Sequence, residues 1–280
     1  PAEPKQADED PRTLGKRYFE RAGEKQAPLW IKSARLSDHE PDASLRLRVS
    51  FGEEVADDVS QDTPSQQAVT RLAEALLPCA VRIDLEPTLC SLVTDLIGEE
   101  PLYTQHIAYW NTPGGGALMH HDAFGEEDCG GQRGVVYTQI AGQTAWLALS
   151  LSDLADRVED YCEFLDNGGA EWVRKHLWPE RTDFERSLAR IRDRRAFEQE
   201  LAKPGCGRFG ELINHGPDFT SFLADAGHGF FLGPGDAVLM PSHSLRQCLM
   251  HSVFCASDET TYGVSVALRA SSPPSSSGNQ

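Results

Sequence analysis

The feature that most constrains the fold of this chain is the division of its strand-like segments into two sets. The segments are rich in β-branched and aromatic residues and lie at 44–51, 102–110, 134–140 and 143–150, then at 229–232, 237–241, 248–255 and 262–268. Between the two sets, residues 151 to about 225 show apolar residues at helical spacing. The pattern predicts a mainly β fold with helical additions, in which a helical insertion interrupts the strands.

Short antiparallel strands on both sides of an insertion favour a double-stranded β-helix, the jelly-roll architecture of cupins. We expect residues 44–270 to form this domain, with the insertion at 151–225. Residues 1–43 read as an N-terminal arm that is partly disordered, and its polar part at 1–27 is expected to be loose or helical only in part. Residues 271–280 (SSPPSSSGNQ) read as a disordered tail.

Charge and composition exclude several classes of function. The formal net charge is −17, from 43 acidic against 26 basic residues, and such a surface repels the phosphate backbone of nucleic acids. The mean hydropathy is −0.41 and no long apolar run occurs, so we expect no membrane span. The seven cysteines include no Cys-x-x-Cys pair, and no signal-peptide pattern opens the sequence. A cytoplasmic protein with reduced thiols is expected.

A possible metal site begins with His120 and Asp122, which are two residues apart beside a predicted strand. Side chains at i and i+2 point to the same side of a strand, so these two can converge while His121 faces away. Two His and one carboxylate form the facial triad of non-haem Fe(II) oxygenases. The third ligand should be a downstream histidine. Strand-like sequence on both sides favours His251, and His243 remains the alternative.

Beside this motif, residues 114–116 are three consecutive glycines, which we interpret as a flexible turn. They do not form a phosphate loop, because no Gly-Lys-Ser/Thr sequence follows.

Four segments together resemble the JmjC/cupin-like family of 2-oxoglutarate oxygenases. They are His120-x-Asp122, GVVYTQIAGQTAWLAL at 134–149, GPGDAVLMP at 233–241 and MHSV at 250–253. The resemblance covers roughly residues 102–150 and 229–269. It implies Fe(II) as the metal, 2-oxoglutarate as cosubstrate, and His120, Asp122 and His251 as the iron ligands. It also implies hydroxylation of a substrate as the usual reaction.

Two positions depart from the family pattern. Thr144 stands where the family usually has the lysine that binds the distal carboxylate of 2-oxoglutarate, and Ala117 stands where a threonine is common. A carboxylate still needs a cationic partner. Arg269, at the end of the last predicted strand, is the first candidate, and the hydroxyls of Tyr137 and Thr144 could add hydrogen bonds. Two further arginines, Arg246 and Arg133, are alternatives.

Three function classes therefore remain. The first is an Fe(II)/2-oxoglutarate-dependent oxygenase that hydroxylates a small molecule or a protein side chain, so the expected partner is a small-molecule or peptide substrate. The second is a metal-dependent cupin enzyme, a dioxygenase or isomerase, that does not use 2-oxoglutarate; Thr144 and Ala117 favour it. The third is a non-catalytic cupin binding module. The insertion could cap the barrel mouth or form the interface of a homodimer.

Overall fold

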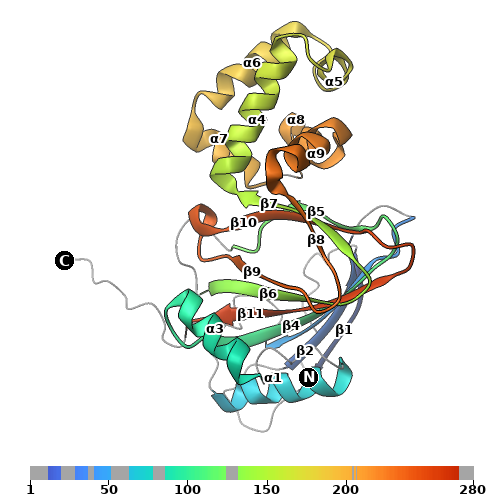
Figure 1. The fold of residues 1–280 in the computed structure, drawn as a ribbon, viewed down its shortest axis with the longest axis vertical. Coiled ribbons are helices and arrows are strands. Elements are labelled where there is room, and N and C mark those ends of the chain that lie inside the picture. The colour runs from blue at the N-terminus through green and yellow to red at the C-terminus, as the bar shows by residue number, and fades with distance from the viewer. Residues whose placement is uncertain are drawn as a thin grey trace, which may run out of the picture.

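The computed structural model describes residues 12–19, 29–36, 41–51, 63–77, 86–123, 132–203, 205 and 207–270. These residues form two antiparallel sheets, with a small number of helices below them and a larger helical part above them in Figure 1. No helix among them combines the length and the apolar character needed to cross a membrane.

The large sheet has seven strands in the order β1-β2-β3-β4-β11-β6-β9. Its strands are β1 (Thr13–Phe19), β2 (Leu29–Arg35), β3 (Leu45–Phe51), β4 (Leu102–Asn111), β6 (Gln132–Ala141), β9 (Ala237–Pro241) and β11 (Thr261–Arg269). The small sheet has four strands in the order β5-β10-β7-β8. They are β5 (Gly116–His120), β7 (Thr144–Ser150), β8 (Gly229–Leu232) and β10 (Leu249–Cys255). The mainly β architecture expected from the sequence is confirmed, but hydrogen bonds do not close the described strands into a barrel.

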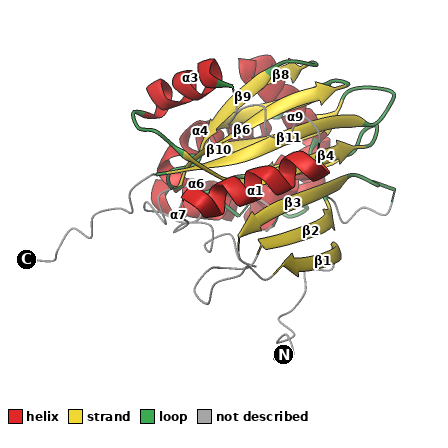
Figure 2. Ribbon diagram, turned by 90° about the horizontal axis from the view of Figure 1, so that it is seen from below, coloured by secondary structure: helices red, strands yellow, loops and turns green. Residues whose placement is uncertain are grey.

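Helices α1 (Thr63–Leu76) and α3 (Pro87–Ile97) cover the outer face of the large sheet (Figure 2). The alternation in β3 explains this packing: Val49 and Leu47 lie in one apolar cluster with Val69 of α1. The other face of β3, which carries Arg46 and Arg48, is turned toward the small sheet and lines a pocket. Period-2 patterning thus separates the outer core from the inner pocket.

The prediction of a loose or partly helical N-terminal arm at 1–43 is wrong for the residues in this range that the structure describes. β1 and β2 lie within that range and extend the large sheet by pairing with each other and with β3. Lys16 and Lys32 interrupt the apolar alternation of these strands, so the sequence pattern for a half-buried strand is weak there. The predicted disorder of residues 271–280 lies outside the described residues.

The segment around Ala141 and Gly142 is a second correction. Only these two residues separate the predicted strands at 134–140 and 143–150, a spacing that predicts a tight hairpin. Instead β6 pairs with β11 and β9 in the large sheet, whereas β7 pairs with β10 and β8 in the small one. The turn therefore carries the chain from one sheet to the other, with Gly142 at φ 71°.

The helical character expected for the insertion is present. Its helices are α4 (Leu151–Asp166), α5 (Glu171–Leu177), α6 (Arg181–Ile191), α7 (Arg194–Leu201), α8 (Gly207–His215) and α9 (Pro217–Leu223). A one-turn π-helix, η2 (Ala224–His228), leads into β8, and a 3₁₀ turn, η3 (Leu245–Gln247), precedes β10.

The insertion packs on the outer face of the small sheet, and one part of it reaches the pocket between the sheets. Leu147, Leu149 and Met250 of that sheet share one apolar cluster with residues of α4 and α9, among them Leu154 and Phe219. Only α8 reaches the pocket, where Glu211 and Asn214 contribute to its wall. The small sheet thus lies between the helices of the insertion and the large sheet (Figure 1), with the pocket on its inner side.

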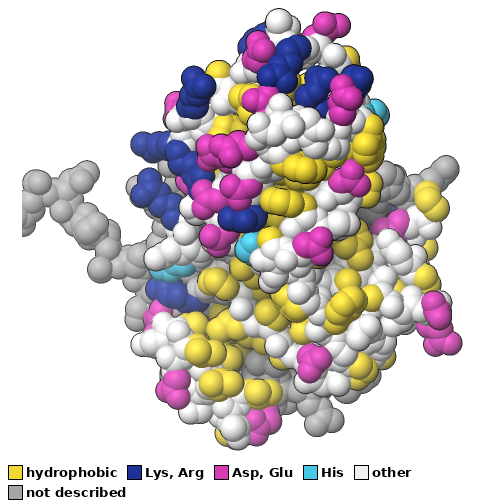
Figure 3. All heavy atoms as spheres, turned by 45° about the horizontal axis from the view of Figure 1, so that its top comes forward, with side chains coloured by type: hydrophobic (Ala, Val, Ile, Leu, Met, Phe, Trp, Pro, Cys, Tyr) yellow, Lys and Arg dark blue, Asp and Glu magenta, His cyan; other side chains and the backbone are white. Residues whose placement is uncertain are grey.

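The surface of the insertion carries basic and acidic side chains next to each other (Figure 3). Arg194 contacts both Asp156 and Glu198 at 2.7 Å, and Arg186 contacts Asp183 at 2.8 Å. The positive charges of Arg186 and Arg194 are therefore balanced by neighbouring carboxylates.

Candidate metal centre

Strands β5 and β10 bring the predicted ligands together. They are antiparallel neighbours in the small sheet, and His120 lies directly opposite His251. A Cβ on Gly116, at the start of β5, would lie 2.0 Å from the carbonyl oxygen of Val253. A glycine is therefore required for this close approach of the two strands. The glycine run does more than form a turn, since it seats the histidine-bearing strand against its partner.

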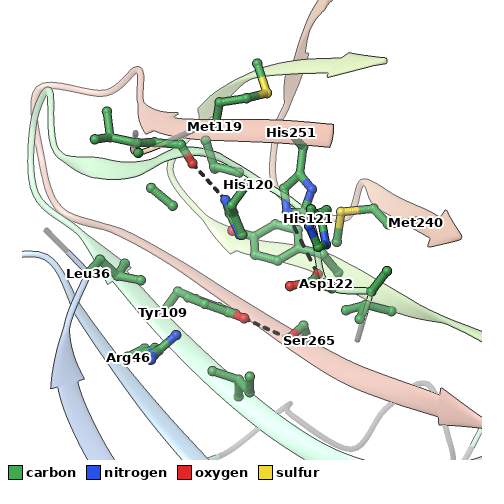
Figure 4. Close-up of a pocket in the computed structure, with 18 of the residues that line it drawn as sticks. Leu36, Arg46, Tyr109, Met119, His120, His121, Asp122, Met240, His251 and Ser265 are labelled. Carbon is green, nitrogen blue, oxygen red and sulfur yellow. Dashed lines mark hydrogen bonds and ion pairs between the residues drawn. The ribbon is translucent and has the colours of Figure 1, made fainter. Parts of the chain in front are cut away.

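His120, Asp122 and His251 form a compact cluster (Figure 4). One ligand atom from each lies within 4.8 Å of the others. The two imidazole centroids are 4.2 Å apart, and Nε2 of His251 lies 3.9 Å from Oδ2 of Asp122. Two imidazole nitrogens and one carboxylate on one side of a point make up a facial triad, which leaves further positions open for other ligands.

Backbone hydrogen bonds fix the protonation of both histidines. Nδ1 of His120 lies 2.7 Å from the carbonyl of Leu118, and Nδ1 of His251 lies 3.1 Å from the carbonyl of Leu249. A carbonyl only accepts, so each Nδ1 carries the proton and each Nε2 presents a lone pair. Burial lowers the pKa of His251 to about 4, with His120 adding to the effect. At neutral pH His251 is therefore an uncharged ligand.

The loop after β5 is tied down by Gln132, the first residue of β6. Its side-chain amide donates to the backbone carbonyl of Asp122 and to the hydroxyl of Ser242, each at 2.7 Å. Because Gln132 is buried, these bonds hold the segment that carries the carboxylate. The adjacent His121 turns toward the insertion, where its Nε2 donates to the carbonyl of Ala202 at 3.1 Å.

The rival third ligand does not join the cluster. His243 accepts from Arg133 at 3.3 Å, and it does not line the pocket. Among the described residues, the cluster capable of holding a metal is the one formed with His251.

The cluster opens into a pocket of about 1020 Å³ between the two sheets. One wall, the Tyr137 side, is hydrogen-bonded within itself. The Gln139 side-chain oxygen accepts from the hydroxyls of Tyr137 and Thr144, each at 2.8 Å. The Thr144 oxygen accepts in turn from Nε1 of Trp146 at 2.9 Å, and the Trp146 ring stacks on His251.

This network bears on the cosubstrate role expected for Tyr137 and Thr144. Each hydroxyl has one proton and donates it to Gln139, whereas a carboxylate accepts hydrogen bonds only. Binding a carboxylate there would require these bonds to break. Burial raises the pKa of Tyr137, so its hydroxyl stays protonated at neutral pH.

Arg269 is placed as the strand alternation predicts. It lines the pocket together with Ser265 and Ala267, and its side chain is 1% exposed. It lies opposite Gln132 in the β11–β6 pairing, which puts it at the same end of the pocket as the triad. Arg133, which pairs with Glu99, and Arg246, which is exposed, do not line the pocket.

Sequence reasoning missed the opposite wall. Tyr109 of β4 donates or accepts a 3.2 Å hydrogen bond with Ser265, and Arg46 lies beside it in the pocket (Figure 4). Burial, with a contribution from Asp122, raises the pKa of Tyr109 to about 12. The signal for Arg46 and Arg48 was their alternation with apolar residues in β3, which a solvent-facing strand face explains equally well.

No family model matches the chain, and no curated protein matches it either. Among solved structures it is similar to YcfD, a ribosomal oxygenase from Escherichia coli, with 13% identity and a TM-score of 0.32 over 94% of this chain and 41% of that one. A YcfD structure with cobalt and 2-oxoglutarate gives 13% identity and a TM-score of 0.29 over 94% and 42%. The chain thus spans less than half of these proteins. Identity and TM-score this low do not decide its function.

Proposed function

We propose that this protein is an Fe(II)- and 2-oxoglutarate-dependent oxygenase that hydroxylates a small molecule or a protein side chain. The observation that carries the proposal is the His120–Asp122–His251 cluster, with both Nδ1 atoms held by backbone carbonyls and both Nε2 atoms left to coordinate. Two imidazoles with fixed tautomers and one carboxylate are the donor set that Fe(II) oxygenases use. The residues present therefore fit the metal.

The strand order supports the finer description of the fold. Four strands of the large sheet, β4-β11-β6-β9, lie across the pocket from β5-β10-β7-β8. Eight strands in two facing sheets are the arrangement of a jelly roll. We infer a double-stranded β-helix whose large sheet is widened by β1, β2 and β3.

Bound Fe(II) and 2-oxoglutarate would supply the activation of O₂ that couples decarboxylation of the 2-oxo acid to oxidation of the substrate. The chain itself holds the metal through His120, Asp122 and His251. Trp146, only 3% exposed, covers His251 on the side of the network and excludes water there. Arg269 provides the buried cation that the distal carboxylate of 2-oxoglutarate requires.

A second candidate is a metal-dependent cupin enzyme, a dioxygenase or isomerase, that works without 2-oxoglutarate. The observation that favours it is the network around Gln139, which uses the protons of the Tyr137 and Thr144 hydroxyls and leaves that wall without a donor for a carboxylate. Both candidates require the metal and differ only in the cosubstrate. The non-catalytic module remains as the outcome if no metal binds.

Anaerobic titration separates these candidates. Fe(II) is added to the metal-free protein, then 2-oxoglutarate, and the visible charge-transfer band of the Fe(II)–2-oxoglutarate chelate is recorded. Succinate is measured after O₂ is admitted. A band and succinate that both disappear in Asp122→Ala support the oxygenase. Metal binding without a band or succinate supports the second candidate, and absence of metal binding leaves the binding module.

A further inference from the structure

The balance of charged residues that line the pocket is opposite to that of the whole sequence. Acidic residues outnumber basic ones by 43 to 26 over the sequence, yet the described residues that line the pocket include five Lys or Arg side chains and only two carboxylates. The basic residues are Arg12, Lys32, Arg46, Arg48 and Arg269. Of the carboxylates, Asp122 belongs to the metal centre, and Glu211 pairs with Arg208 at 3.1 Å. Among the described residues that line the pocket of this acidic protein, basic side chains therefore predominate.

Strand register concentrates this charge on one wall. Lys32 lies directly opposite Arg48 in the β2–β3 pairing, and Arg46 lies two residues from Arg48 on the same face. Like charges directly opposite each other destabilise a sheet. An anion bound beside them at Arg46 would make charge-assisted hydrogen bonds with the guanidinium.

Arg46 is the most available of these cations. It makes no hydrogen bond or ion pair with any residue that the structure describes, and it is half-buried in the pocket wall. Its guanidinium offers five N–H donors in a planar fork that matches phosphate and carboxylate groups.

The position of Arg46 relates it to the metal centre. It lies opposite Tyr109 in the β3–β4 pairing, and Tyr109 stands between it and Asp122 in Figure 4. Both charges act on the Tyr109 hydroxyl: Asp122 raises its pKa and Arg46 lowers it. A ligand of small-molecule size can therefore contact Arg46 and reach the triad within one pocket of about 1020 Å³.

On the proposed function, 2-oxoglutarate uses the metal at one end and Arg269 at the other. Arg46 of β3, on another wall of the same pocket, is then left for the second reactant. We propose that the substrate is a small molecule with a phosphate or carboxylate group, which Arg46 binds with Arg48 and Lys32 beside it, while its reacting carbon lies at the triad. The part of this inference that concerns the reaction at the triad rests on the proposed function. The anion site at Arg46 does not depend on it.

The test measures anion binding without the metal. Inorganic phosphate is titrated by calorimetry into the full chain after chelator treatment, at low and constant chloride. Wild type should bind phosphate, and Arg46→Gln should weaken binding about 10- to 100-fold through loss of a charge-assisted pair. Arg46→Lys, which keeps the charge, should retain more affinity than Arg46→Gln. Arg35→Gln is the matched control: Arg35 is exposed on the neighbouring strand β2, outside the pocket, and its loss should change nothing.

Equal phosphate affinity in wild type and Arg46→Gln overturns the proposal, as does the absence of phosphate binding by wild type. So does a loss seen with Arg269→Gln but not with Arg46→Gln, since the anion would then occupy the cosubstrate position. A metal titration on the same preparation keeps the two ideas apart. Phosphate binding without metal binding refutes only the oxygenase, and metal binding without phosphate binding refutes only the anion site.

Discussion

The two walls of the pocket handle polar groups in opposite ways. On the Tyr137 side, Gln139, Thr144 and Trp146 satisfy one another, and burial is almost complete. On the Arg46 side, cations stand in register across β2 and β3, and Arg46 bonds to no described residue. A wall whose hydrogen bonds are internally satisfied contributes shape and stability, whereas Arg46, which bonds to no described residue, has capacity for a ligand. The metal centre lies between the two.

Among variants that test this difference between the two walls, Arg269→Gln is expected to have the largest effect. If Arg269 and not the Tyr137 side holds the distal carboxylate, the dissociation constant for 2-oxoglutarate should rise about 30- to 100-fold, or about 2–3 kcal/mol. The charge-transfer titration measures it. Fe(II) affinity should not change, because the ligands are elsewhere. Arg246→Gln, which removes an exposed charge outside the pocket, is the control. An unchanged dissociation constant for Arg269→Gln would assign the carboxylate to another residue.

Gln132→Ala tests how the carboxylate ligand is positioned. Losing the bond to the Asp122 carbonyl should weaken divalent-metal affinity about 10- to 100-fold, as loss of a supporting contact to a ligand usually does. Competition against a fluorescent chelator gives the affinity. Gln143→Ala, in the exposed turn before β7, should leave it unchanged. A metal affinity equal to that of wild type would mean that Asp122 is held by other contacts.

The substitution Thr144→Val tests whether the hydrogen bonds of the Tyr137 side stabilise the fold without binding the cosubstrate. The change leaves the buried Nε1 of Trp146 without its acceptor, so the free energy of unfolding should fall by about 1–3 kcal/mol. Urea denaturation measures this fall, and 2-oxoglutarate affinity should stay as in wild type. Thr138→Val is the control, since the Thr138 hydroxyl bonds to no described residue. A specific loss of 2-oxoglutarate affinity would instead restore the cosubstrate role of Thr144.

The last effect concerns Tyr109, at the boundary of the two walls, and is confined to alkaline pH. Its pKa is raised from 10.0 to about 12 in the folded protein. A raised folded pKa contributes stability below pH 10 that is lost as pH rises toward 12. The free energy of unfolding should therefore fall over this window by up to about 2–3 kcal/mol. In Tyr109→Phe the decline should be shallower. Denaturation at several alkaline pH values checks it, and parallel curves would contradict the assignment.

The sequence predicted that His120 and Asp122 converge because residues two apart at a strand end share a direction. In the structure His120 ends β5, Asp122 follows it directly, and His251 lies on β10. The sequence predicted the helical insertion for a similar reason, since Leu154, Val158, Cys162 and Leu165 repeat at helical spacing over many turns and are all buried. It missed β1 and β2, whose alternation is interrupted by lysines. Without those strands, the face of β3 that carries Arg46 was expected to be exposed to solvent. The basic wall of the pocket could therefore not be inferred.

Which strands belong to which sheet could also not be predicted from the sequence. A turn containing Gly142 suits a hairpin as well as a crossing between sheets, because the glycine meets the same local demand in both. The internal hydrogen bonding of the Tyr137 side was missed for a related reason. Pairing of hydroxyls with Gln139 depends on register and crossing geometry, which local sequence does not encode.

The most direct test of the central claim is a metal titration of wild type, His251→Ala, His243→Ala and Asp122→Ala, with Mn(II) followed by electron paramagnetic resonance. The account predicts one tightly bound ion per chain in wild type and in His243→Ala. It predicts at least a 100-fold loss of affinity in the two triad variants, with thermal unfolding showing that both remain folded. Full metal affinity in His251→Ala together with loss in His243→Ala would contradict it, because the metal would then lie outside the His120–Asp122–His251 cluster.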